Sequence, residues 1–345
     1  FVHVGFLICF TSGICITSDL YVHGGYDMYH GKVSADIARG LKELKRRIKK
    51  AKIPPSKLDE SINIATWNIR EFGKKARKEA SIHYIAEILG QFDLIAITEL
   101  RDNLSDFAKV LGILGPYWRA VYSDYIMDTG GNRERMAYLY DKRAVSFTGL
   151  ASELDAPRKK NKATGEYLPE FSWWRSPFIA SFRAGSFDFI LITAHIRWGS
   201  DEKDRIKPLK LLAECVDRKK KEKHEADKDI ILMGDFNIPR VNDDLYKAVT
   251  SKGLMVPSAI LGKSHGSNLA KDKRYDQILH YPSYTKCFTD NAGVLDFYTG
   301  GIADFYPGEK LSKEEFTYEL SDHLPLWIQL NVDIEEEQLD QIIRQ

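Results

Sequence analysis

Residues 234–238 read Gly-Asp-Phe-Asn-Ile and directly follow the apolar run 230–233. An apolar run that ends in a small turn is typical of a buried strand that carries polar side chains at its end. Asp235 and Asn237 are two positions apart, so they lie on the same side if the strand geometry continues. A carboxylate and an amide oxygen at a strand end suit a hard cation and a phosphate group. Because Gly-Asp turns are common, this interpretation depends on whether other segments share the design.

Several other apolar segments place a metal-binding or proton-transferring residue type at one end. They are 62–69 with Asn68 and Arg70, 92–98 with Glu99 and Arg101, 187–195 with His195, 276–278 with Asp276, and 326–330 with Asp322 and His323 just before it. A single Asn, Asp or His at such a place is most often a turn, cap or structural residue. Six such places in one chain favour a shared site over six independent structural roles.

The composition limits the class of protein without deciding it. A chain of 345 residues can hold two domains or one large α/β domain, and its apolar and aromatic content is ample for a core. The formal net charge of +1 does not indicate nucleic-acid binding, although local arginines at a groove can suffice for it. Four cysteines are too few for a disulfide scaffold, and their spacing does not indicate zinc. We expect Cys215 and Cys287 to be buried thiols rather than a bridge.

We expect three parts in the chain. They are an N-terminal extension over 1–60, a large domain over 61–332 and an acidic tail over 333–345. Within the extension, the spacing of apolar residues predicts a basic helix over 34–52, and the pair Pro54-Pro55 marks a break before the domain. We expect the tail to form a short acidic helix.

Residues 1–16 are mostly apolar, but they are too few for a transmembrane span. Three interpretations stay open: the apolar region of a signal peptide, a buried strand, and an upstream extension. The compartment is therefore open between the cytoplasm and secretion. The domain lacks an obvious apolar loop that would engage a membrane, so we expect no stable membrane insertion.

Two features of the domain concern its connections and its surface. Residues 135–140 and 144–150 predict a hairpin across a turn at 141–143. Residues 155–170 are polar and basic and contain Pro and Gly, which predicts an exposed loop. The basic run 157–162 in this loop is either simply solvated or a grip on a nucleic-acid backbone.

Seven short motifs occur in the order that they have in the endonuclease/exonuclease/phosphatase superfamily. They are Trp-Asn-Ile-Arg-Glu-Phe-Gly at 67–73, Thr-Glu-Leu-Arg-Asp at 98–102, Arg-Glu-Arg at 133–135, Ala-His at 194–195, Gly-Asp-Phe-Asn at 234–237, Tyr-Asp-Gln-Ile at 275–278 and Ser-Asp-His at 321–323. Among the branches of this superfamily, the chain looks most like deoxyribonuclease I, over about residues 61–332. The resemblance implies an α/β (α+β) fold, namely a four-layer sandwich of two packed β-sheets flanked by helices, with the active site at the strand ends along one edge.

The resemblance also implies a set of metal- and phosphate-binding residues. They are Asn68, Glu99, Asp235, Asn237 and Asp322. Magnesium prefers oxygen ligands and usually takes one or two carboxylates, with water and substrate phosphate completing its shell. We expect Mg²⁺ as the cofactor, with Mn²⁺ and Ca²⁺ as alternatives. Glu99 is the best candidate for a ligand, with Asn68 beside it.

His195 and His323 match the family's two catalytic histidines. The resemblance assigns Glu134 as the carboxylate that orients His195. It likewise assigns Asp276 to His323, and it includes Asp235 in the catalytic set. A histidine transfers protons well near neutral pH because its pKa is close to the working pH. One pair would deprotonate water and the other would protonate the leaving 3′-oxygen, and the sequence leaves open which does which.

The two carboxylates also have ordinary interpretations. Glu134, between two arginines, could be a surface charge, and Asp276 could be a turn residue.

Four arginines are candidates for substrate contacts. They are Arg70, Arg101, Arg135 and Arg197. Arg70 and Arg101 match positions at which deoxyribonuclease I places arginines at the DNA groove and backbone, and the guanidinium fork suits phosphate oxygens. Either could instead be a structural ion-pair partner.

The chain departs from deoxyribonuclease I in three places. Arg197-Trp198 stands where that enzyme has small residues, the segment 155–170 lacks its close cysteine pair, and residues 1–60 have no counterpart. The tryptophans at 173, 174 and 198 lie close in sequence to basic residues, so they either stack on bases or pack in the core. These differences leave the catalytic residues in place and bear on the substrate.

These features predict a divalent-metal-dependent endonuclease that hydrolyses DNA with low sequence preference to 5′-phosphate ends and acts as a monomer. The first alternative keeps the chemistry and changes the substrate to that of a phosphoinositide phosphatase or a sphingomyelinase. An abasic-site repair enzyme is disfavoured, because the segment before Arg135 lacks that branch's glycine-serine-glycine pattern. An alternative of another class is a catalytically inactive nucleic-acid-binding module, against which the retained acidic residues and histidines argue.

Overall fold

The computed structural model describes residues 28–125, 132–225, 227–262, 265–281 and 287–344, and the apolar segment over 1–16 lies outside them. In chain order, the elements are α1 (Ala35–Ala51), β1 (Ser61–Phe72), α2 (Glu79–Leu89), β2 (Leu94–Leu100), α3 (Ser105–Leu114), β3 (Trp118–Tyr122), β4 (Arg135–Asp141), β5 (Ser146–Glu153), β6 (Arg158–Lys160), β7 (Tyr167–Pro169), β8 (Phe178–Ala184), β9 (Phe187–His195), η1 (Glu202–Arg205), α4 (Ile206–Lys221), β10 (Ile230–Asp235), α5 (Asp244–Thr250), η2 (Ser258–Ile260), β11 (Asp276–His280), β12 (Phe288–Val294), α6 (Lys313–Glu319), β13 (Leu326–Asn331) and α7 (Glu335–Ile343).

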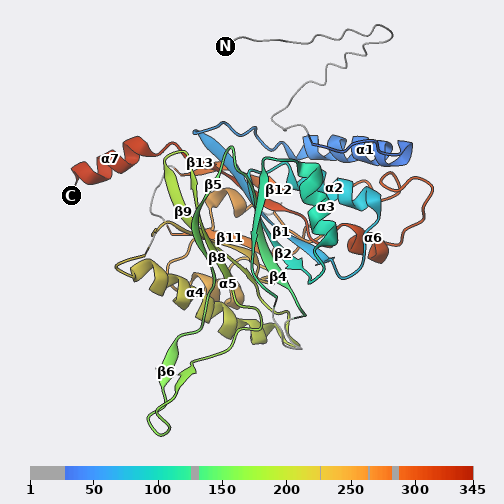
Figure 1. Ribbon diagram of the computed structural model, residues 1–345. Coiled ribbons are helices and arrows are strands. Elements are labelled where there is room, and N and C mark those ends of the chain that lie inside the picture. The colour runs from blue at the N-terminus through green and yellow to red at the C-terminus, as the bar shows by residue number, and fades with distance from the viewer. Residues whose placement is uncertain (1–27, 126–131, 226, 263–264, 282–286, 345) are drawn as a thin grey trace, which may run out of the picture.

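Two β-sheets pack face to face in the middle of the molecule (Figure 1). In the described residues, the first sheet has the strand order β12-β13-β1-β2-β4-β3, and the second has the order β11-β10-β9-β8-β5. Helices α1, α2, α3 and α6 lie on the side of the first sheet, and α4 and α5 lie on the side of the second (Figure 1). This arrangement confirms the expected four-layer sandwich.

Because the side chains of β1 alternate between its two faces, this strand contributes to two hydrophobic cores. Ile62 and Ile64 belong to the core that includes the second sheet, whereas Trp67 and Ile69 belong to the core under the helices. Successive side chains of a strand point to opposite faces. Asn68 continues the even-numbered face, so its side chain points toward the second sheet at the end of the strand.

The register of the strands brings the ends of both sheets to one edge. β1 and β2 run parallel, so Asn68 and Glu99 emerge at the same edge of the first sheet. β9 and β10 also run parallel, and their last residues, His195 and Asp235, lie opposite each other. β11 runs antiparallel to β10 and begins at Asp276, which lies opposite Asp235. Residues far apart in the sequence therefore meet along this edge.

The basic helix expected over 34–52 forms as α1 and packs on the body. Ser34 caps its N-terminus by accepting a hydrogen bond from the backbone N–H of Ile37 at 3.2 Å. Arg47 is buried, and its guanidinium donates to the backbone carbonyls of Phe297 at 2.8 Å and Gly301 at 2.7 Å. These bonds tie α1 to the segment between β12 and α6. None of the helices in the described part of the chain is long and apolar enough to span a membrane.

The hairpin expected over 135–150 is wrong. β4 pairs with β2 and β3 in the first sheet, whereas β5 pairs with β8 in the second. Asp141 at the end of β4 is buried, and its carboxylate accepts bonds from the backbone N–H of Arg143 at 2.9 Å and from its guanidinium at 2.6 Å. This turn directs the chain from one sheet to the other. The spacing is that of a hairpin, but β4 buries both faces and contributes Ala137 and Leu139 to the core under the helices, whereas β5 contributes only to the core between the sheets.

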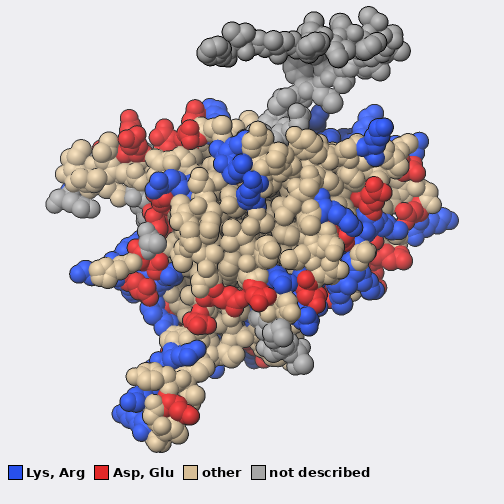
Figure 2. Space-filling view, viewed as in Figure 1, with Lys and Arg blue, Asp and Glu red and all other residues tan. Residues whose placement is uncertain are grey.

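The loop expected over 155–170 contains a short antiparallel hairpin, β6–β7, that projects from the body (Figure 1). We call residues 157–169 the arm. Its turn is closed by a hydrogen bond from the backbone N–H of Asn161 to the carbonyl of Glu166 at 2.7 Å, and Gly165 has a φ of +77°. Figure 2 shows basic side chains along the arm. Because both faces of these strands meet solvent, the sequence has no apolar alternation that would predict them.

A buried carboxylate near the start of β2 makes the stability of the fold depend on pH. Asp93 accepts hydrogen bonds from the backbone N–H of Asn63 at 2.7 Å and from the hydroxyl of Ser56. Burial raises the pKa of Asp93 to about 6, and the charge of Asp141 adds to the effect. The folded protein therefore binds this proton more tightly than the unfolded chain does.

We expect Asp93→Asn to stabilise the protein at pH 7 but not at pH 4. The stability that Asp93 supplies is fully present below its unfolded pKa, and it is lost as pH rises through about 6. A shift of this size corresponds to at most about 3 kcal/mol. The free energy of unfolding, measured in urea between pH 4 and 7.5, should fall more steeply for the native protein than for the variant. Parallel curves would contradict the prediction, and exposed Asp290→Asn is the control.

Candidate active site

Asn68 links the two sheets at the edge where their strands end. Its Nδ2 donates hydrogen bonds to Glu99 Oε1 at 3.0 Å and to Asp235 Oδ2 at 2.9 Å. Glu99 is held a second time, by a bond from the backbone N–H of Glu71 to Oε2 at 2.8 Å. Glu99 has a φ of +63° and Asn237 has a φ of +54°, a left-handed backbone that side chains rarely adopt. Both strand ends therefore bend sharply where their polar side chains gather.

One histidine–carboxylate pair joins His195, at the end of β9 in the second sheet, to Glu134, just before β4 of the first sheet. His195 Nδ1 lies 2.8 Å from Glu134 Oε2, and the other oxygen of Glu134 accepts a bond from Arg175 Nη2 at 2.7 Å. His195 Nε2 lies 3.6 Å from Asp235 Oδ2 and 4.0 Å from Glu99 Oε1. The ring is therefore held at Nδ1, and its Nε2 faces the two acidic side chains.

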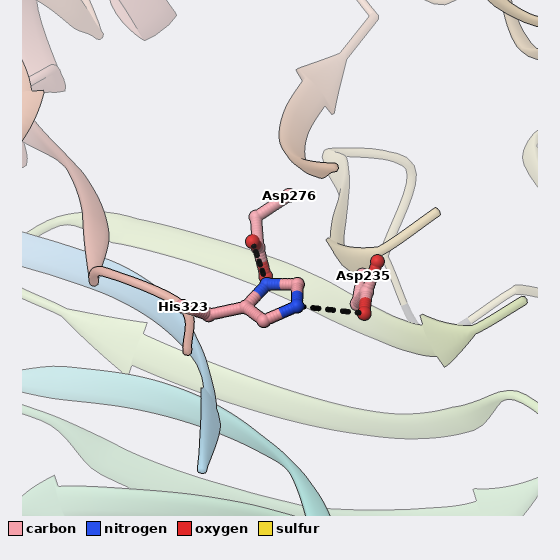
Figure 3. A group of neighbouring side chains, drawn as sticks. All are labelled: Asp235, Asp276 and His323. Carbon is pink, nitrogen blue, oxygen red and sulfur yellow. Dashed lines mark hydrogen bonds and ion pairs between the residues drawn. The ribbon is translucent and has the colours of Figure 1, made fainter. Parts of the chain in front are cut away.

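A matching pair lies against the same aspartate (Figure 3). His323 Nδ1 lies 2.7 Å from Asp276 Oδ2, and its Nε2 lies 3.7 Å from Asp235 Oδ2. The hydroxyl of Ser321 donates to the carbonyl of Asn68 at 2.6 Å and accepts from the backbone N–H of His323 at 2.9 Å. These bonds position the segment before β13 against the end of β1.

Charge decides how strongly the first pair holds its proton. Burial opposes ionisation of Glu134, but the charges and hydrogen bonds of His195 and Arg175 outweigh it and lower the pKa of Glu134 to about 2. Burial and the charge of Arg175 oppose protonation of His195. The carboxylates of Glu134 and Asp235 outweigh both and raise the pKa of His195 above its ordinary value.

The second pair shows a stronger effect of the same sign. Burial opposes protonation of His323, but the charges of Asp276 and Asp235 and the hydrogen bond to Asp276 raise its pKa well above the ordinary value. Asp322 is half-buried, and its charge adds to this increase. Both histidines of the site therefore hold a proton more firmly than a free imidazole does.

The oxygen atoms around Asn68 fit a hard divalent cation. Asn68 Oδ1 is buried and has no hydrogen-bond partner among the described residues, although its Nδ2 bonds two carboxylates. A buried acceptor without a partner, beside carboxylates from Glu99 and Asp235, is a group that a cation would satisfy. These three residues are the ones that would hold Mg²⁺.

Asn237 shares this edge with the acidic side chains. Its backbone N–H donates to Asp235 Oδ1 at 2.9 Å, and its Nδ2 donates to the carbonyl of Ile196 at 2.8 Å. The motif at 234–238 is therefore held together by its own hydrogen bonds, and Asn237 fixes the carboxylate of Asp235.

Asp235, Asp276 and His323 also offer possible ligand atoms that all lie within 4.8 Å of one another (Figure 3). We favour the oxygen set around Asn68 for Mg²⁺, because Mg²⁺ prefers oxygen to imidazole nitrogen. In the group of three, Asp276 is already engaged by His323 Nδ1. That arrangement suits proton transfer better than metal binding.

The four candidate arginines lie close to the site in sequence, and each has a protein partner. Arg70 bonds the hydroxyl of Thr317. Arg101 Nη1 lies 3.4 Å from Glu71 Oε1. Arg135 Nη2 lies 3.4 Å from Asp124 Oδ1, and the guanidinium carbon of Arg197 lies 3.8 Å from the ring centroid of Trp174. The contacts of Arg101 and Arg135 are long and Arg197 is exposed, so these three guanidinium groups can exchange their partners for a phosphate group. Arg70 is held more firmly, because its guanidinium carbon also lies 3.8 Å from the ring centroid of Tyr318.

The contacts that three residues make in the site were not predicted from the sequence. Arg175 holds Glu134, Ser321 positions His323, and the ring of Tyr275 lies 5.8 Å from the ring of His323 between centroids. Ser321 and Tyr275 stand within the motifs at 321–323 and 275–278, so their place next to the charged residues was the available signal. Arg175 follows an irregular segment without periodicity, and the sequence offers no comparable signal for its partner.

Comparison with known families matches residues 65–323 to the Endonuclease/Exonuclease/phosphatase family. The chain belongs to this family. Members are hydrolases of phosphate esters, so the chain is assigned to that class of enzyme, and divalent metals are general in the family. A protein called deoxyribonuclease from Thioalkalivibrio sp. (strain K90mix) is 28% identical over 289 residues, which cover 79% of this chain and 72% of that protein.

Solved structures of the family show the same fold at low sequence identity. The catalytic domain of human Nocturnin aligns with a TM-score of 0.52 at 15% identity, covering 80% of this chain and 95% of that one. A family protein from Bacteroides thetaiotaomicron gives 0.51 at 18%, covering 79% and 98%. D. rerio TDP2 complexed with a single-strand DNA product gives 0.51 at 17%, covering 79% and 99%. These similarities establish the fold of the family.

Proposed function

We propose that this protein is a divalent-metal-dependent endonuclease that hydrolyses DNA with low sequence preference and leaves 5′-phosphate ends. The observation that carries the proposal is the convergence of two histidine–carboxylate pairs on Asp235. Nε2 of His195 and Nε2 of His323 lie 3.6 and 3.7 Å from the same carboxylate oxygen. The Thioalkalivibrio protein, which is called a deoxyribonuclease, supports DNA as the substrate.

The reaction needs two proton transfers, and the site offers two groups for them. Water attacks the phosphorus atom, and the bond from phosphorus to the 3′-oxygen breaks. One histidine, in its neutral form, accepts the proton of the water at Nε2, and the other, in its protonated form, gives its Nε2 proton to the leaving oxygen. Because the carboxylates of Glu134 and Asp276 engage Nδ1 of their histidines, Nε2 is the atom that exchanges the proton in each case.

The remaining residues would bind and orient the phosphate. A bound Mg²⁺ ion would neutralise charge on the phosphate oxygens, with Mn²⁺ and Ca²⁺ as alternatives. Asn68, Glu99 and Asp235 would hold the ion, with Asn237 and Asp322 beside them. The candidate arginines would contact neighbouring phosphates of the backbone, a role that suits the guanidinium fork. They are Arg70, Arg101, Arg135 and Arg197.

The direct test is cleavage of supercoiled plasmid by the purified protein. We expect nicking with Mg²⁺, no nicking with a chelator, and loss of nicking in a His195→Ala, His323→Ala double variant. Equal cleavage by the double variant and the native protein would contradict the proposal, because no other described pair is placed to transfer the two protons.

The same assay separates the alternatives. Intact plasmid, together with metal-dependent hydrolysis of phosphoinositides or sphingomyelin, would identify a lipid phosphoesterase. Binding of oligonucleotides without turnover, and with affinity that does not depend on metal, would identify an inactive binding module.

A further inference from the structure

The exposed tryptophans of this chain adjoin the histidine–carboxylate pairs. Trp174 is 43% exposed and Trp198 is 53% exposed, whereas Trp67, Trp118 and Trp327 are buried and the sixth tryptophan is half-buried. An exposed indole presents a large apolar surface to water, and tryptophans placed in this way are typical of binding surfaces. The two most exposed tryptophans therefore both flank the candidate active site.

Trp198 is connected to one catalytic pair through an aromatic neighbour. Its ring lies 5.4 Å from the ring of Tyr275 in an edge-to-face arrangement, and Tyr275 lies 5.8 Å from the ring of His323, all between centroids. The guanidinium carbon of Arg205 lies 4.4 Å from the ring centroid of Trp198, and its Nη1 donates to the carbonyl of Trp198 at 3.2 Å. The ring of Tyr275 therefore lies between the ring of His323 and the exposed ring of Trp198.

Trp174 is connected to the other pair through its chain neighbours. Arg175, the next residue, is buried and bonds Glu134, the carboxylate that orients His195. The guanidinium carbon of Arg197 lies 3.8 Å from the ring centroid of Trp174. The backbone at Trp174 is therefore next to a buried, bonded residue, and its indole carries a cation.

The segment that carries Trp198 is held in place by its own hydrogen bonds. The carboxylate of Asp204 accepts bonds from the backbone N–H groups of Ser200 at 3.1 Å and Asp201 at 3.0 Å. Gly199 has a φ of +75°, which lets the chain turn directly after Trp198. A ring that is ordered before binding loses little conformational entropy when a partner stacks on it.

We infer that Trp174 and Trp198 form a stacking platform for unpaired bases on either side of the reacting phosphate, which makes single-stranded or locally unpaired nucleic acid the preferred substrate. This inference rests on the proposed function. Every base has a π-face, so stacking binds a strand without reading its sequence. In a duplex the faces of the bases cover one another, and a platform of this kind gains nothing from them unless bases are unstacked. The positive charge of Arg197, which is exposed, complements the phosphates of such a strand, whereas Arg205 is buried and holds Trp198 in place.

The experiment compares a short unstructured oligothymidylate with a duplex of the same length, both end-labelled and cleaved with Mg²⁺. Trp174→Ala and Trp198→Ala are each expected to raise KM for the single strand about tenfold, the loss typical of one stacked base, with a much smaller change in kcat. KM for the duplex should change little. Trp→Phe at each position should restore most of the loss, because a smaller aromatic face remains.

The control is Tyr117→Ala, which removes another exposed aromatic ring at the opposite edge of the first sheet and should change neither KM. Binding is measured independently as quenching of tryptophan fluorescence by the oligothymidylate in a His323→Ala background. The quenching should fall in both tryptophan variants, and the circular dichroism spectrum and melting temperature check that each variant folds.

Three results would overturn the inference. Equal losses on the single strand and the duplex, or no loss on either, would overturn it and leave the proposed nuclease intact. Failure of the native protein to cleave or bind either substrate would overturn the proposed function together with it. Binding to sphingomyelin vesicles that depends on Trp174 and Trp198, without an effect on oligonucleotides, would assign the rings to a lipid surface.

Discussion

His323→Ala is expected to lower kcat for plasmid cleavage by about 10²- to 10⁴-fold, the range for loss of one general acid or base. The imidazole is buried between Asp276 and Asp235, at 2.7 and 3.7 Å, and these carboxylates hold the ring in the position from which it transfers the proton. KM should change much less, because the ring acts on the transferred proton. The measurement is the initial rate of nicking at saturating Mg²⁺.

Two further variants sharpen this prediction. His224 is exposed and lies outside the site, so His224→Ala should retain the native rate. Adding His195→Ala to His323→Ala should lower the rate little further, because groups that act in one step are not additive. A His323→Ala variant with native kcat would exclude this imidazole from the chemistry.

Glu99→Gln is expected to remove both metal binding and activity. The side chain keeps its size, but the site loses one of the two carboxylates that Asn68 joins. We expect a loss of rate of more than about 100-fold, beyond the 10- to 100-fold typical of residues one step removed from a metal. The stabilisation that a ligand gives to the folded state should disappear as well.

The second effect is measured without any substrate. The melting temperature of the native protein should rise with Mg²⁺ concentration, and that of Glu99→Gln should not. Glu60→Gln, an exposed carboxylate outside the site, is the matched control and should respond like the native protein. A variant that still responds to Mg²⁺ would place the ion on other residues.

The sequence predicted the meeting of distant residues because of strand geometry. His195 and Asp235 end β9 and β10, Glu99 is next to last in β2, and Asn68 directly precedes a register shift between β1 and β2. Parallel neighbours bring such positions to the same edge. Because side chains alternate along β1, the position of Asn68 in the strand also determines the face of the sheet on which it lies. The pairing of His323 with Asp276 depended on the family resemblance, since their segments are short and no period joins them.

Other features of the fold and the site could not be predicted from local sequence patterns. The spacing of β4 and β5 is that of a hairpin, yet they lie in different sheets, and β4, unlike β5, contributes side chains to both cores. The arm has strands without apolar alternation, since both of its faces meet water. Arg175 acts on His195 through Glu134, and a contact between an irregular segment and a strand end leaves no periodic signal.

The anchoring of α1 has a consequence for the order in which the chain folds. Arg47 bonds the carbonyls of Phe297 and Gly301, which lie 250 and 254 positions further along the chain. During synthesis from the N-terminus, α1 leaves the ribosome long before these carbonyls exist. Contacts of α1 with α2 can form early, because α2 follows closely in the sequence and Lys45 Nζ lies 2.6 Å from Glu87 Oε1. The bonds of Arg47 must wait until most of the polypeptide has been made. The attachment of α1 to the body is therefore completed late in synthesis.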